Sequence, residues 1–219
     1  LGVVYGTQAA LKRMLPRNRG SIVQVGSALA YRAIPLQSAY CGAKHAIQGF
    51  TESLRSELIH DEQDISISMV QLPALNTPQF GWCETRMPRK PQPVPPIYEP
   101  EVAARAIHWA AYHERRELVV GFNAAVILWG NKFFPGFGDR YLARTAFEGQ
   151  QHNGPVEADR PSNLWEPVDD RQDFGASGDF GESARPESWQ LWANTHRWVL
   201  WLGLMALLTL VIVMLMWIF

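Results

Sequence analysis

Cysteine is scarce in this sequence, and its scarcity excludes two classes of small protein. Cys41 and Cys83 are the only cysteines among 219 residues, and they do not form a CxxC pair. A disulfide framework or a structural zinc site needs more cysteines at short spacing. The six histidines include no HExxH motif. We therefore expect no metal site and a reducing compartment.

The sequence also lacks a long stretch of basic charge. The formal net charge is −1; residues 1–150 carry 16 Lys and Arg against 12 Asp and Glu, whereas residues 151–197 carry 4 against 9. No basic block or basic stripe interleaved with aromatics occurs, so we expect no nucleic-acid partner. The later, acidic part is rich in Asp, Gly, Pro and Ser, which is typical of a linker.

Charge of either sign is absent from the last 22 residues, 198–219. As a helix this run would be about 33 Å long, enough to cross a bilayer core of about 30 Å. Trp198, Trp201 and Trp217 lie near its ends, where indole rings suit the two membrane interfaces, and Arg197 precedes it. The sequence therefore predicts a single-pass membrane protein with a lipid bilayer as a partner, its other domain being cytoplasmic.

The preceding chain alternates helical and strand patterns. Strands are indicated where β-branched residues lie between turn signals, and helices where apolar residues recur every three or four positions. The expected helices cover residues 1–15, 40–58 and 99–112, and the expected strands cover 21–26, 65–71 and 118–121. This order predicts an α/β fold with a parallel sheet. Three strands are too few for an open sheet covered on both faces, so we expect further strands before Leu1.

Four segments follow from these patterns. Residues 1–121 are predicted to be part of an α/β domain, which the family resemblance given below implies is the second half of a Rossmann-like, doubly wound domain. Residues 122–149 are aromatic and apolar, and are interpreted as a segment that covers this domain; an interfacial membrane contact is the alternative. Residues 150–197 are expected to be a disordered acidic linker, and residues 198–219 the transmembrane helix.

Three polar residues have the character of a catalytic site. Tyr40 and Lys44 are four residues apart, so that on a helix both side chains project from one face. A nearby ammonium favours the phenolate and lowers the pKa of a tyrosine, which suits a general acid and base in carbonyl–alcohol interconversion. Ser27 follows the first strand, at the sheet edge where such folds place their chemistry. A solvated surface pair is the alternative for Tyr40 and Lys44.

The order and spacing of three motifs resemble those of the later half of the short-chain dehydrogenase/reductase family over residues 1–121. The motifs are Gly20-Ser21-Ile22-Val23-Gln24-Val25-Gly26-Ser27, then Tyr40-Cys41-Gly42-Ala43-Lys44, then Gln71-Leu72-Pro73-Ala74-Leu75-Asn76-Thr77-Pro78. The resemblance implies hydride transfer with NAD(P)(H). It also implies that Tyr40 exchanges the proton, that Lys44 holds the nicotinamide ribose, and that Ser27 steadies the substrate oxygen. The cofactor-binding set is then Tyr40, Lys44, Pro73, Ala74 and Thr77.

The sequence departs from the family pattern in two places. The family usually has Pro-Gly with a threonine five residues after the proline, whereas here Ala74 follows Pro73 and Thr77 comes at four. The family's glycine-rich phosphate loop has no counterpart, and about 90–100 residues upstream would supply it. Without that part, the chain would be inactive.

The predicted function is therefore a membrane-tethered NAD(P)-dependent oxidoreductase; the alternative is a catalytically inactive, membrane-anchored scaffold or fragment of the same family. The substrate would be a small-molecule alcohol or carbonyl. Phe80, Trp82 and Met87, in the expected substrate lid between residues 77 and 100, suggest a hydrophobic one, unless they only pack the lid down. The resemblance also suggests a homo-oligomer that pairs through the helices at 1–15 and 40–58.

Overall fold

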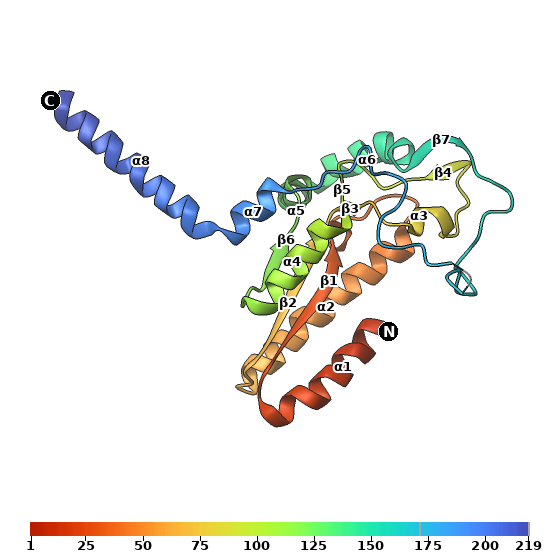
Figure 1. Ribbon diagram of the computed structural model, residues 1–219, viewed down its shortest axis with the longest axis horizontal. Helices are drawn as coiled ribbons and strands as arrows, with labels where there is room; N and C mark the ends of the chain where they lie inside the picture. Colours follow the sequence, from red (N-terminus) through yellow and green to blue (C-terminus); the bar gives the residue numbers. More distant parts are fainter. Residues whose placement is uncertain (171, 219) are drawn as a thin grey trace.

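The computed structural model describes residues 1–170 and 172–218, without the side chains at 211, 213 and 215–218. Its helices and strands follow one another along the chain as labelled in Figure 1. In order they are α1 (Gly2–Met14), β1 (Gly20–Ser27), α2 (Ser38–His60), β2 (Ile65–Leu72), β3 (Ala74–Leu75), α3 (Gln79–Trp82), β4 (Arg89–Pro91), β5 (Ile97–Tyr98), α4 (Pro100–Tyr112), β6 (Glu117–Val119), α5 (Phe122–Phe133), α6 (Pro135–Gly149), β7 (Gln151–Pro155), α7 (Trp189–Thr195) and α8 (Arg197–Ile218).

The main sheet is parallel and has the strand order β1-β2-β6. Gly20 pairs with Ile65 at one end of the β1–β2 ladder, and Ser27 pairs with Leu72 at the other. Parallel neighbours need a crossover, and α2 and α4 provide the two crossovers of this sheet. The predicted α/β fold with a parallel sheet is therefore confirmed. Two small pairs, β3 with β5 and β4 with β7, lie outside the main sheet.

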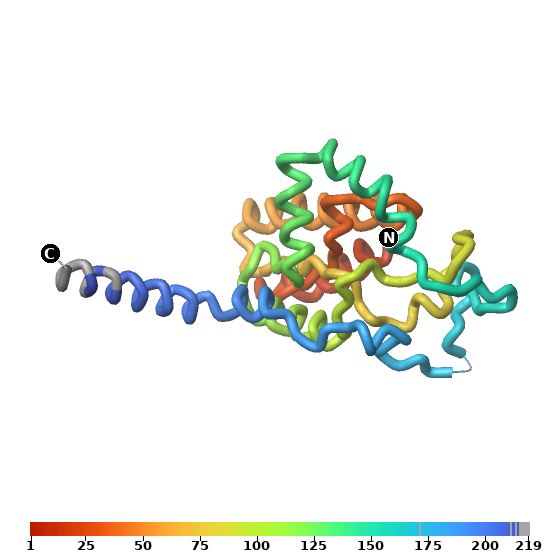
Figure 2. Tube along the Cα trace, turned by 90° about the horizontal axis from the view of Figure 1, so that it is seen from above, coloured from red at the N-terminus to blue at the C-terminus, as the bar shows by residue number. Residues whose placement is uncertain are grey.

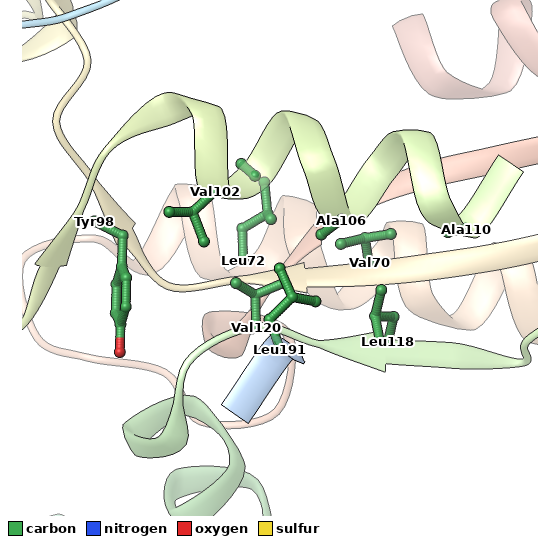
Figure 3. Close-up of a cluster of buried hydrophobic side chains, with 10 residues drawn as sticks. Val70, Leu72, Tyr98, Val102, Ala106, Ala110, Leu118, Val120 and Leu191 are labelled. Atoms are coloured by element: carbon green, nitrogen blue, oxygen red, sulfur yellow. The ribbon is translucent and has the colours of Figure 1, made fainter. Parts of the chain in front are cut away.

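Helices cover both faces of the sheet because the strands alternate apolar residues between the faces. On one face, Ile22 and Ile67 form a buried cluster with Leu58 of α2, and Met14 of α1 packs against it. On the other face α4 packs against β1 and β2, in a cluster that also includes Leu118 of β6 (Figure 3). Its small residues Ala106 and Ala110 let the helix approach the strands closely. The second cluster is Val70, Leu72, Tyr98, Val102, Ala103, Ala106, Ala110, Leu118, Val120 and Leu191.

The apolar segment after β6 forms the two helices α5 and α6. Ala124 and Leu128 of α5 are buried in a cluster with Ala28, which follows β1. The opposite side of α5 leaves large side chains in solvent, among them Trp129 at 62% exposure and Phe133 at 69%. The segment therefore packs on the domain through a narrow strip of small and aliphatic residues. Its role as a covering segment stays a prediction.

The polar chain between β7 and α7, residues 156–170 and 172–188, is called the strap below. Figure 1 shows it returning past α3 and the β3–β5 pair. Near its end the Arg185 amide donates to the carbonyl of Ile97 at 2.9 Å, and the Glu99 amide donates to the carbonyl of Arg185 at 3.0 Å. The strap thus extends the small β3–β5 pair by backbone hydrogen bonds. That residues 150–197 are a disordered linker stays a prediction.

Helix α8 extends away from the body of the protein in both Figure 1 and Figure 2. In the part of the chain that the structure describes, no helix has both the length and the apolar character needed to cross a membrane. Trp217 and Phe219 of the predicted span lie outside the described side chains. The predicted single-pass membrane location is therefore wrong, and the bilayer partner and the argument for a cytoplasmic domain lose their basis.

Candidate active site

Ser27 lies at the carboxyl end of β1 and is 7% exposed. Its hydroxyl accepts a hydrogen bond from the Leu29 amide at 3.1 Å, which caps the short 3-10 turn Ala28–Ala30. The residue before it, Gly26, leaves room for a side chain of the neighbouring strand. A Cβ at Gly26 would lie 2.3 Å from Oε1 of Gln71. A larger residue at this position would therefore displace the end of the Gln71 side chain.

Tyr40 and Lys44 lie in the first two turns of α2, on the face next to β1. The Lys44 Nζ lies 5.5 Å from the centroid of the Tyr40 ring. It donates a hydrogen bond to the carbonyl of Val25 at 3.0 Å, which ties the helix to the strand. The Ser27 hydroxyl lies close enough to Tyr40 to lower the pKa of its phenol. The fold thus brings together the three residues that the sequence singled out.

Burial sets the charge states of this pair. Removal from water raises the pKa of Tyr40, because it disfavours the phenolate, and the nearby Ser27 hydroxyl opposes that rise. Removal from water lowers the pKa of Lys44, because it disfavours the ammonium. The pKa of Tyr40 is therefore raised, whereas the charge of Lys44 alone was expected to lower it. With 44% of its surface exposed, Tyr40 nevertheless remains open to a ligand.

Pro73, Ala74 and Thr77 follow β2 at the same end of the sheet as Ser27. Ala74 lies in β3 and pairs with Ile97, and the Thr77 amide donates to the carbonyl of Leu75 at 3.0 Å. All three are partly exposed. A Cβ added at Gly121 would lie 3.4 Å from the Pro73 ring, and the backbone there has φ +86°. The chain that follows β6 therefore packs against Pro73 at the start of this segment.

Asn76 is the residue that the sequence motifs did not single out. It is 1% exposed. Its amide nitrogen donates to both carboxylate oxygens of Glu99, at 3.3 and 3.2 Å, and its Oδ1 accepts from the Phe180 amide at 2.9 Å. Its backbone carbonyl accepts from the Gly178 amide at 3.1 Å. Asn76 therefore joins the segment after β2 to the start of α4 and to the strap. Its partners are too distant along the chain for any local sequence pattern to indicate these hydrogen bonds.

Residues 1–85 contain β1, α2 and β2, and with them Ser27, Tyr40 and Lys44. This stretch matches the family model described as short chain dehydrogenase. Residues 1–85 are therefore similar to the short-chain dehydrogenase family. The resemblance drawn from the motifs is thus confirmed for this part of the chain.

Curated relatives match over longer and shorter stretches. The oxidoreductase YxnA of Bacillus subtilis is 34% identical over 164 residues, which are 74% of this chain and 44% of YxnA. Human dehydrogenase/reductase SDR family member 7 is 45% identical over 58 residues, which are 26% of this chain and 17% of that protein. This chain therefore spans less than half the length of these two relatives.

Among solved structures, a short-chain dehydrogenase from Burkholderia cenocepacia in complex with NADP is similar to this chain. The TM-score is 0.48 and the identity is 25%, with 64% of this chain and 55% of that chain covered.

Proposed function

We propose that this chain carries the catalytic residues of an NAD(P)-dependent oxidoreductase that interconverts a carbonyl and an alcohol. The observation that carries the proposal is that Tyr40 and Lys44 of α2 lie at the carboxyl end of β1, where Ser27 ends the strand: the Lys44 Nζ lies 5.5 Å from the centroid of the Tyr40 ring and donates to the carbonyl of Val25 at 3.0 Å. Two hydroxyl groups at the carboxyl edge of a parallel sheet can bind one substrate oxygen together. The match of residues 1–85 to the short-chain dehydrogenase family supports the same reaction class.

Tyr40 is proposed to exchange the proton with the substrate oxygen. Its raised pKa keeps the phenol protonated at neutral pH, so that it can donate a proton to a carbonyl oxygen that gains negative charge. In the reverse direction the phenolate accepts the proton of the alcohol, and the positive charge of Lys44 stabilises that phenolate. Ser27 is proposed to donate a hydrogen bond to the same substrate oxygen and to orient it.

The donor groups at this edge fit the nicotinamide riboside end of NAD(P), which members of this family bind. An ammonium has three donors. Among the residues that the structure describes, one N–H of Lys44 donates to the carbonyl of Val25. The remaining donors can bind ribose hydroxyls. Pro73, Ala74 and Thr77 are proposed to line the nicotinamide beside it. When bound, the cofactor supplies or accepts the hydride.

The substrate is proposed to be a small, partly apolar alcohol or carbonyl compound. Its outer part would lie against α3, which follows Thr77 and carries Phe80 and Trp82. A homo-oligomer that pairs through α1 and α2 stays a prediction.

Replacement of the tyrosine hydroxyl tests the proposed role. In the full-length protein, Tyr40→Phe should lower kcat/KM for NAD(P)H-dependent carbonyl reduction by about 10²-fold or more, because general acid–base catalysis contributes roughly that factor. Cofactor oxidation measured with a panel of apolar ketones gives the rates. Tyr112→Phe is the matched control, because Tyr112 lies on α4 and is 76% exposed; its rates should equal those of the parent protein. Equal turnover by Tyr40→Phe would refute the role, and no turnover by the parent protein would favour the scaffold alternative.

A further inference from the structure

Gln150, directly after α6, is a buried glutamine that bonds to the loop between Ser27 and α2, residues 28–37. It is 1% exposed. Its Oε1 accepts from the side-chain amide of Gln37 at 2.7 Å, and its Nε2 donates to the carbonyl of Pro35 at 3.0 Å and to that of Ala146 at 2.9 Å. Every hydrogen-bonding group of its side-chain amide thus has a partner, as burial of an amide requires. Two of these three bonds reach the loop.

The two bonds to the loop lie on either side of Leu36, whose backbone is strained. Leu36 has φ +69°, in the left-handed region where the side chain of a residue other than glycine is crowded. About half of its surface is exposed, so burial of its own side chain contributes little to this conformation. A strained backbone persists where the surrounding structure fixes it. The hydrogen bonds that Gln150 makes at Pro35 and Gln37 supply such a restraint.

The strained turn leads directly into the helix that carries Tyr40. Helix α2 begins at the residue after Gln37, and the Gln37 side chain donates to Gln150. The first N–H groups of a helix have no partner within the helix, so its first turn depends on contacts outside it. Tyr40 lies in this first turn, whereas Lys44 lies one turn later and has its own bond to the carbonyl of Val25. The placement of Tyr40 therefore depends on the loop more than that of Lys44 does.

We propose that Gln150 is a positioning residue that holds Tyr40 in place through the turn at Leu36. The proposal rests on the proposed function for the effect on turnover, whereas the effect on the placement of Tyr40 is separate from it. The backbone carbonyl of Gln150 also accepts from the Gln92 amide at 3.0 Å. Replacement of the side chain leaves that backbone bond in place, so the variant removes only the bonds of the side chain.

Steady-state kinetics of the full-length protein test this role. Gln150→Ala should lower kcat for NAD(P)H-dependent carbonyl reduction by about 10-fold or more, because misplacement of a reacting group by about 1 Å can cost about 10²-fold. The KM for NAD(P)H should stay within about 2-fold of the parent value, because Lys44 keeps its bond to β1. Rates are divided by the concentration of cofactor-binding sites, measured by fluorescence titration with NAD(P)H, so that a smaller folded fraction does not count as a lower kcat.

Gln151→Ala is the matched control. Gln151 is the next residue, and its side chain also donates to a carbonyl four positions earlier, that of Phe147, at 2.9 Å. Within the part of the chain that the structure describes, it makes no side-chain hydrogen bond to the loop at 28–37. The kcat of Gln151→Ala should therefore equal that of the parent protein. An equal loss of kcat in Gln150→Ala and Gln151→Ala would overturn the proposal.

Gln37→Ala tests whether the effect passes through the loop. Gln37 donates the bond that the Gln150 carbonyl oxygen accepts, so Gln37→Ala alone should also lower kcat. The double variant Gln37→Ala with Gln150→Ala should have the same kcat as Gln150→Ala, because the effects of two residues that act through one contact do not add. A double variant that combines two separate losses would place the effect of Gln150 elsewhere and overturn the proposal.

A measurement without turnover separates this proposal from the proposed function. In NMR spectra of the protein with ¹³C-labelled tyrosine, the ring signal that Tyr40→Phe removes belongs to Tyr40. Gln150→Ala should shift this signal, and Gln151→Ala should leave it in place. Such a shift in a protein without NAD(P)H-dependent turnover would contradict the proposed function and leave the positioning of Tyr40 standing. An unchanged signal and an unchanged kcat in Gln150→Ala, with turnover lost in Tyr40→Phe, would overturn the positioning role and support the proposed function.

Discussion

At the scale of single residues, the carboxylate of Glu117, at the start of β6, accepts two hydrogen bonds. Tyr31 donates to its Oε1 at 2.6 Å, and the Gln71 amide donates to the same oxygen at 2.8 Å. Burial and this acceptor raise the pKa of Tyr31 above its ordinary value of 10.0, because both disfavour the phenolate. Tyr31 thereby fixes the turn after β1, which carries Ser27, to β6.

This raised pKa predicts a loss of stability in base. The folded state holds the phenol proton more tightly than the unfolded state, so the stabilisation is complete below about pH 10, the unfolded pKa, and falls as the pH rises toward the folded pKa. The free energy of unfolding, measured by urea titration between pH 8 and pH 11, should therefore decline above about pH 10. In Tyr31→Phe it should be about 1 kcal/mol lower at pH 8 and decline less steeply. An equal slope in both proteins would assign the decline to other groups.

At the scale of elements, the strap approaches the segment after β2 too closely for a side chain. A Cβ at Gly178 would lie 2.5 Å from the carbonyl oxygen of Thr77 and 3.1 Å from Oδ1 of Asn76. Both atoms belong to a segment that is held on its other side by Glu99 and Tyr98. The backbone of the strap must therefore move if any residue larger than glycine replaces Gly178.

Gly178→Ala should detach the strap locally and expose it to protease. Limited proteolysis should cleave the strap several times faster than in the parent protein, because cleavage follows the population of the open segment. Gly181→Ala is the matched control. A Cβ there would lie 3.8 Å from Nδ2 of Asn76, an ordinary contact distance, so cleavage should be unchanged. Equal cleavage of both variants would contradict the close approach at Gly178.

At the scale of the whole molecule, the cluster between the sheet and α4 joins parts that are distant in sequence. Leu191 of α7 packs with Leu118 of β6 and Val102 of α4 in this cluster (Figure 3). The Gln190 side chain also donates to the carbonyl of Val119 at 2.8 Å. Helix α7, which follows the strap, thus packs against the same core that supports the site.

Leu118→Ala tests how far this core stabilises the protein. Leu118 is 4% exposed, and its truncation should lower the free energy of unfolding by about 2–4 kcal/mol through lost burial and an internal cavity. Leu164→Ala is the control at a position that is 55% exposed, and its effect should stay within about 0.5 kcal/mol. Chemical denaturation of the two variants gives both values. A small effect of Leu118→Ala would show that this part of the core repacks.

Local pattern predicted much of the fold and of the candidate site. The expected strands at 21–26 and 65–71 lie within β1 and β2, and the expected helix at 40–58 lies within α2. Periodicity decides these elements because each has one apolar face to bury. Ser27, Tyr40 and Lys44 were readable for the same reason, since a strand end and a four-residue helix spacing place side chains predictably.

The sequence by itself determined the α/β order, the parallel sheet and the three polar residues at its edge, because those features follow from repeats of two and of three to four residues. Only the tertiary structure decided the partners of Asn76 and Gln150. Asn76 and Phe180 are 104 positions apart, and no local period marks their hydrogen bond. Such a hydrogen bond depends on the sheet and the helices that position both segments. Burial likewise decided the direction of the pKa shift of Tyr40. The four-residue spacing between Tyr40 and Lys44 gives no information about that burial.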